Sequence, residues 1–173
     1  MGLTASEMST ANQKAPGTYS KKEHKAAAGF SAFEVLRWNR HLPDAEQYSR
    51  QEHQAAPGFD SWETRWWNRC LPNAEQYTKA EYTAAPLFSA LEALRWNRDM
   101  CDAEEYTKAE HKAAPGFSAQ DARWWNIDFP RAEQYSKQEH TTAPGFCATE
   151  ALCWNANFPN AEQYTDAEIE GLE

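Results

Sequence analysis

Four Glu-His pairs are the residues whose types and spacing most suggest chemistry. They are Glu23-His24, Glu52-His53, Glu110-His111 and Glu139-His140. Carboxylate and imidazole are common ligands of zinc and other transition metals, so the pairs could hold a metal ion or a pigment. In one further copy of the motif Tyr82 replaces the histidine, which removes a ligand but keeps an aromatic ring.

The same residues also have a structural interpretation, which the sequence favours. Ser49 and Glu52 fit the S/T-x-x-E pattern of a helix capping box, in which the glutamate bonds back to the cap. His53 would then pack against Tyr48, the residue before the cap, as a hydrophobic staple. Tyr82 suits ring packing but not metal ligation. We therefore expect packing at these positions and no cofactor, with metal or pigment binding as the alternative.

Tryptophan followed by asparagine is the second recurrent feature. The tryptophans are Trp38, Trp67, Trp96, Trp125 and Trp154, and the arginines within two residues of them are Arg37, Arg65, Arg95 and Arg123. Tryptophan and arginine are enriched at hot spots of protein interfaces, and arginine also stacks on indole rings. These residues are candidates for partner binding, although packing within and between copies is the favoured role of the tryptophans.

No pattern in the sequence indicates an enzyme. A glycine-rich phosphate loop, a GxSxG motif and an HExxH motif are all missing. Carboxylates recur at equivalent positions in every copy, whereas a catalytic pair needs positions that differ from their equivalents. We therefore expect no catalytic residue.

All these residues follow a period of 29 residues. The period is clearest in six tyrosines: Tyr19, Tyr48, Tyr77, Tyr106, Tyr135 and Tyr164. A fixed period of roughly 20–50 residues is typical of solenoids and other repeat arrays. The sequence thus predicts a flexible N-terminal segment (1–18), five repeats and a C-terminal cap (164–173). The repeats are 19–47, 48–76, 77–105, 106–134 and 135–163.

Each repeat is expected to form two helices, which makes the fold an all-α array of helix–turn–helix units, solenoid-like or extended. In the repeat 48–76 the second helix is predicted over about 61–67. The first helix of the next repeat is predicted over about 74–85. Asn68 would end the second helix in the left-handed conformation. Asn73 with Gln76 could cap a third helix, so three helices per repeat stay possible.

The stretch between the two helices and the stripe on the second helix give two further expectations. Pro-Gly predicts a turn with glycine at positive φ, and the turns at Ala28-Gly29 and Pro86-Leu87 should differ from the others. Phe59, Trp62 and Trp66 are spaced to share one apolar face of the second helix.

The second helices also alternate along the chain. Leu-Arg-Trp-Asn in the first and third repeats alternates with Arg-Trp-Trp-Asn in the second and fourth. This pattern predicts duplication of a two-repeat block, or a partner whose sites alternate.

Composition limits the partners and the compartment. The net charge of −9 argues against nucleic acid as a partner, because a phosphate backbone attracts clustered lysine and arginine. Aliphatic residues are scarce, with Val35 the only valine, whereas there are 8 Trp, 7 Tyr and 8 Phe, so the core should be thin and aromatic. The cysteines do not recur in register, which predicts free thiols in a reducing compartment. They are Cys70, Cys101, Cys147 and Cys153.

Membrane attachment is expected to be weak at most. No stretch approaches the ~20 apolar residues of a membrane span. Residues 1–6 fit the N-myristoylation pattern, with Gly2 as the acceptor, and one such chain gives only a reversible tether. We expect an intracellular protein, cytoplasmic or associated with the cytoskeleton.

These observations lead to one functional expectation and one alternative. The chain is predicted to be a non-enzymatic structural or adaptor protein that binds a repetitive protein assembly, a filament or a lattice, through several repeats at once. The alternative is a repeat protein that binds metal or pigment at its Glu-His positions.

Overall fold

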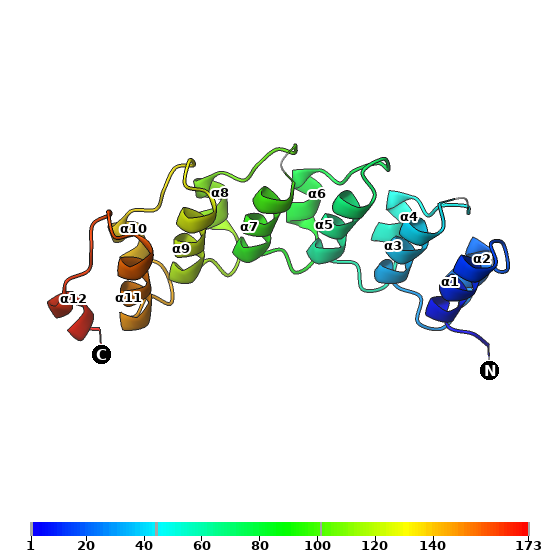
Figure 1. Ribbon diagram of the computed structural model, residues 1–173, viewed down its shortest axis with the longest axis horizontal. Coiled ribbons are helices and arrows are strands. Elements are labelled where there is room, and N and C mark those ends of the chain that lie inside the picture. The colour runs from blue at the N-terminus through cyan, green and yellow to red at the C-terminus, as the bar shows by residue number, and fades with distance from the viewer. Residues whose placement is uncertain (1, 44, 101, 173) are drawn as a thin grey trace. The chain divides into compact units, whose positions relative to one another are not determined.

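The computed structural model describes residues 2–43, 45–100 and 102–172, so Met1, Asp44, Cys101 and Glu173 lie outside the described residues. Over these ranges the chain is all-helical, with twelve helices that follow one another at regular intervals of the sequence (Figure 1). They are α1 (Ala5–Lys14), α2 (Lys21–Ala26), α3 (Ala32–His41), α4 (Arg50–Gln54), α5 (Ser61–Cys70), α6 (Lys79–Ala84), α7 (Ala90–Asp99), α8 (Lys108–Ala113), α9 (Ala119–Asp128), α10 (Lys137–Thr141), α11 (Ala148–Asn157) and α12 (Asp166–Glu170). The predicted all-α array of helix–turn–helix repeats is confirmed. The helices fall into two compact units, Met1–Phe88 and Ser89–Glu173, which are described separately.

The first helix of each repeat begins at the predicted capping box. Ser49 accepts a hydrogen bond from the Glu52 N–H, and the Glu52 carboxylate accepts one from the Ser49 N–H at 2.9 Å. The helix that follows is shorter than predicted, because the residues before the cap are not helical. In the third repeat the helix begins at Lys79, since the N-cap residue Thr78 is extended and Tyr77 before it is not helical.

A contact made by Asn68 accounts for the late start of the first helix. Asn68 lies inside α5 and does not end it, so the predicted left-handed cap is wrong. Its buried amide donates to the Tyr77 carbonyl at 2.8 Å and accepts from the Tyr77 N–H at 2.7 Å. The capping box predicted for Asn73 and Gln76 is not formed either, because the Gln76 amide donates to the carbonyls of Leu71 and Ala74 instead.

The turn between the two helices has one geometry in the repeats of the first unit. Gly29, Gly58 and Leu87 all have positive φ, at 77°, 77° and 62°. The expected difference between these turns is therefore not observed. Leu87 is the one non-glycine residue with positive φ in the described ranges, a conformation that is strained for a residue with a β-carbon.

Successive repeats are joined at the start of each second helix. The N–H of Ala32, which has no partner within α3, donates to the carbonyl of Pro57 in the next repeat at 2.9 Å. Ser61 and Pro86 repeat this bond, as do Ala119 and Pro144 in the second unit. Each of these repeats thus supplies a hydrogen-bond acceptor to the start of a helix in the repeat before it.

The N-terminal segment corrects the expectation of a flexible start. Thr4 and Glu7 form a capping box for α1, and the Ala5 N–H donates to the Ala28 carbonyl at 2.9 Å. Asn12 bonds both backbone groups of Tyr19, as Asn68 does those of Tyr77. Residues 4–19 are therefore a half-repeat that retains the second helix alone. At the other end, α12 begins at another capping box, as expected for the cap.

Candidate interaction surface

The structure separates the two members of each Glu-His pair. Glu52 caps α4 and forms an ion pair with Lys21 at 2.8 Å, whereas the His53 side chain is fully buried. Within the described ranges, no three His, Cys, Asp or Glu side chains gather as a metal site would require. The geometry therefore gives no support to the metal or pigment alternative.

The buried imidazole joins two repeats. Its ring lies 4.6 Å from the ring of Trp67 in its own repeat, and the Nδ1 atom of His53 is 2.9 Å from the Tyr77 hydroxyl of the next. Tyr77 donates that hydroxyl proton to the Arg50 carbonyl, so Nδ1 is the donor to its oxygen. The predicted staple with Tyr48 is wrong, because the Tyr48 ring packs back on His24 of the preceding repeat.

Burial favours the neutral form of several of the equivalent rings. It lowers the pKa of His24 and of His111 to about 4. It also lowers the pKa of His140 and raises the pKa of Tyr48 and of Tyr135. A proton on these histidines would leave a charge in an aromatic interior.

The five tryptophans that recur in every repeat belong to the same interior. None of Trp38, Trp67, Trp96, Trp125 and Trp154 is more than 2% exposed. The Trp67 indole N–H donates to the carbonyl of Glu75 at 3.0 Å. Their role as packing residues accounts for their recurrence, and a partner could not reach them without disrupting the fold.

Internal ion pairs hold Arg37, Arg95 and Arg123, and they differ between repeats in a way that bears on the alternation along the chain. Arg65 and Arg123 are buried, and Arg37 and Arg95 are half-buried. Arg37 lies 3.5 Å from Glu34 in its own helix, whereas Arg123 donates to Glu150 of the next repeat at 2.9 Å. Arg37 and Arg95 thus pair within their own helices while Arg123 pairs with the next repeat, and an alternating partner is not needed to explain the pattern.

A different set of bulky apolar residues faces solvent. On the outer side of the second helices Phe33 is 50%, Trp62 37%, Leu91 45% and Trp124 42% exposed. The predicted apolar face that joins Trp62 to Phe59 is wrong, because Phe59 turns inward and packs edge-on against His53 at 5.5 Å. A comparison of the repeats distinguishes the internal tryptophan from the exposed one. The position of Trp67 is tryptophan in every repeat, whereas Gln120 stands at the position of Trp62 in the fourth.

In the first unit Phe33 and Trp62 border a groove between α3 and α5, which lie side by side (Figure 1). This α3–α5 groove has a volume of about 360 Å³ and is lined by Phe33, Leu36, Arg37, Arg40, His41, Trp62, Trp66 and Cys70. The rings of Trp62 and Trp66 are 5.4 Å apart, and the Arg69 guanidinium lies 5.2 Å from the Trp66 ring centre. The groove is therefore aromatic and flanked by positive charge.

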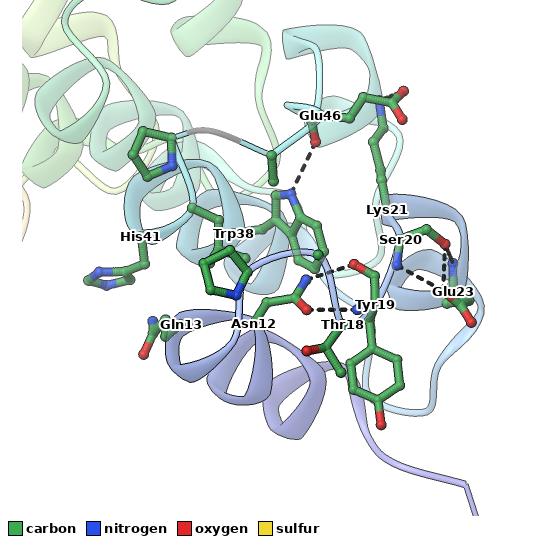
Figure 2. Close-up of a pocket in the computed structure, with 15 residues that line it drawn as sticks. Asn12, Gln13, Thr18, Tyr19, Ser20, Lys21, Glu23, Trp38, His41 and Glu46 are labelled. Atoms are coloured by element: carbon green, nitrogen blue, oxygen red, sulfur yellow. Dashed lines mark hydrogen bonds and ion pairs between the residues drawn. The ribbon is translucent and has the colours of Figure 1, made fainter.

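A second kind of groove recurs where consecutive repeats meet on the loop side. In the first unit it has a volume of 440 Å³ and lies between the Asn12–Tyr19 pair and the Trp38 indole, as Figure 2 shows. In the second unit a groove of 460 Å³ is bounded by the equivalent residues Tyr106 and Trp125. We call these the loop-edge grooves.

Comparisons with protein families, curated proteins and solved structures find no match to this chain. None of the helices in the described part of the chain combines the length and the apolar character needed to cross a bilayer. The expected free thiols are observed at Cys70, Cys147 and Cys153, and Cys101 lies outside the described residues.

Two residues of the candidate myristoylation motif, Ser6 and Gly2, lie in the described part of the chain. The Ser6 hydroxyl accepts a hydrogen bond from Arg37 at 2.5 Å, which accounts for this serine without a lipid. Gly2 borders a shallow groove beside Leu3 and Met8. Myristoylation of Gly2 stays a prediction, and Met1 of the motif lies outside the described residues.

Proposed function

We propose that the chain is a non-enzymatic intracellular adaptor that binds a repetitive protein assembly, such as a filament or a lattice, through several repeats at once. The observation that supports it best is the exposure of bulky apolar side chains on the second helices of both units. Phe33, Trp62 and Leu91 occupy one helix position in three successive repeats, and Trp124 is exposed one turn further along α9.

The recurrence of these contact points suits a partner that is itself periodic. Sites that are individually weak give strong binding when one chain engages several of them and their spacing matches the partner. The loop-edge grooves add to this support, because residues that recur with the repeat build them at equivalent places in both units. In this proposal the invariant interior residues set the spacing and the exposed ones make contact.

Site-specific photo-crosslinking in cell extract tests the proposal. A photo-reactive amino acid replaces Trp62 or Trp124 in the full chain, and Gln51, exposed on the first helix α4, serves as the control position. We expect positions 62 and 124 to capture the same protein, in the sedimenting polymer fraction, and position 51 to capture much less. Different proteins at the two positions, or capture of free monomers alone, would overturn a periodic partner.

A further inference from the structure

We propose that the α3–α5 groove receives an acidic segment of a partner protein, in which a bulky apolar side chain is flanked by aspartate or glutamate. This inference rests on the proposed protein-binding function and specifies the chemistry of the partner at one of its sites.

The shape of the groove favours a single anchoring side chain. Its volume of about 360 Å³ is near the lower end for ligand pockets, roughly 300 Å³, so it can seat one large side chain with part of its backbone. Phe33 and Trp62 stand 6.5 Å apart at its rim, and both are exposed to solvent. Exposed aromatic rings that touch one another mark contact sites more strongly than scattered ones do.

The charge around the groove favours carboxylates on either side of the anchor. Arg40 supplies an exposed positive charge at its edge beside Arg37 and His41, and none of its lining residues is acidic. Arg40 and His41 are exposed, and neither side chain forms an ion pair with another residue in the described ranges. The chain carries a net charge of −9, so this cationic border is a local exception and fits a negatively charged partner.

The corresponding face of α7 and α9 in the second unit provides a natural comparison. Gln120 stands at the position of Trp62, and Asp128 stands at the position of Cys70. Asp99 takes the place of His41 and forms an ion pair with Arg98 at 3.2 Å. This face keeps the exposed Trp124 but not the cationic border, so a preference for acidic segments should be confined to the first unit.

Binding of synthetic peptides to the full chain tests the inference by fluorescence anisotropy. The probe is a labelled octapeptide of sequence Gly-Glu-Glu-Leu-Trp-Glu-Glu-Gly. One control peptide carries lysine at every glutamate, and the other carries glycine in place of leucine and tryptophan. We expect both controls to bind at least tenfold more weakly than the probe. We also expect the probe affinity to fall with added salt, because the charged contacts are exposed.

Variants then locate the site. Arg40→Glu and Trp62→Ser should each weaken probe binding at least tenfold, whereas Trp124→Ser, which removes an exposed tryptophan of the second unit, should alter it less than twofold. Arg40 is exposed, so Arg40→Glu keeps the test decisive if Trp62→Ser melts early in circular dichroism. Equal loss in Trp124→Ser, or equal binding of the lysine peptide, would overturn the inference.

Two further outcomes separate this inference from the proposed function. A single-stranded oligonucleotide that binds the groove when the acidic peptide does not would show that the aromatic rings stack on bases, and the inference fails. Failure of the peptide while crosslinking from position 124 still captures a polymer would leave the adaptor proposal standing and reject the acidic segment. Failure of both experiments would reject both.

Discussion

The side-chain amide of Asn39 holds both backbone polar groups of Tyr48. Its Nδ2 donates to the Tyr48 carbonyl at 2.7 Å, and its Oδ1 accepts from the Tyr48 N–H at 2.8 Å. The same clamp joins Asn68 to Tyr77, Asn97 to Tyr106, Asn126 to Tyr135 and Asn155 to Tyr164. Each second helix thereby positions the tyrosine that opens the next repeat.

Removing the clamp should destabilise the chain. Asn68→Ala leaves the N–H and the carbonyl of Tyr77 buried without partners, and we expect a loss of about 2–4 kcal/mol in the free energy of unfolding. Urea denaturation followed by circular dichroism measures it. Asn155 is only half-buried at the end of the array, so Asn155→Ala should cost less. Equal losses at the two sites would contradict a role for burial.

The turn at Leu87 should be improved by glycine. Leu87 is 79% exposed and has φ of 62°, so Leu87→Gly relieves backbone strain without giving up buried area. Strain in this conformation is about 1–2 kcal/mol, and the extra freedom of glycine in the unfolded chain offsets part of it. We expect a gain of up to about 1 kcal/mol in thermal or urea unfolding. Gly58→Leu, at the equivalent turn, should have the opposite sign.

The buried histidines should make stability depend on pH below neutrality. In the folded chain burial lowers the pKa of His24 and His111 to about 4, against about 6.5 when unfolded. The unfolded state therefore takes up protons first as pH falls from 6.5, and stability is lost between pH 6.5 and 4. The loss is on the order of 3 kcal/mol per histidine over this window. Urea midpoints between pH 7.5 and 4.5 measure it.

A substitution already present in the chain is the control for this pH dependence. Tyr82 occupies the buried histidine position of the third repeat, so His111→Tyr should be tolerated. The variant should lose part of the slope between pH 6.5 and 4. The lowered pKa of Glu52 and Glu139 adds to the loss only toward the acid end of this window, because their carboxylates begin to take up protons in the unfolded chain as pH approaches 4.5. An unchanged slope in His24→Tyr/His111→Tyr would rule out these two histidines as its source.

Interior and outer tryptophans should respond differently to truncation. Trp67→Ala opens a cavity in the core and should cost about 3–5 kcal/mol in unfolding free energy. Trp62→Ala removes a partly exposed ring and should cost less than about 1 kcal/mol, while it weakens capture of the proposed partner. Thermal melts together with the crosslinking assay distinguish the two effects. A large loss of stability in Trp62→Ala would count against the outer face as a binding surface.

Local patterns in the sequence were enough to predict the array, the capping boxes and the glycine turns, because each depends on residues a few positions apart. The asparagine clamp was missed because it joins residues nine positions apart across a loop. The inward or outward direction of Trp62 and Trp67 depends on which neighbouring helix covers each face, and spacing alone does not give that. The half-repeat was missed because Ala11 stands where α3 has Trp38, although the Thr4–Glu7 capping box was visible.

The hydrogen bond from Ala32 to Pro57 bears on how such a chain can evolve. Both of its ends lie in neighbouring copies, and its geometry is restored whenever a complete copy is gained or lost. Unequal crossing-over in the gene would therefore give longer or shorter chains that still fold. A single added codon inside one copy would instead displace the partners of both adjoining copies. The chain can therefore change its length by whole repeats and keep these contacts.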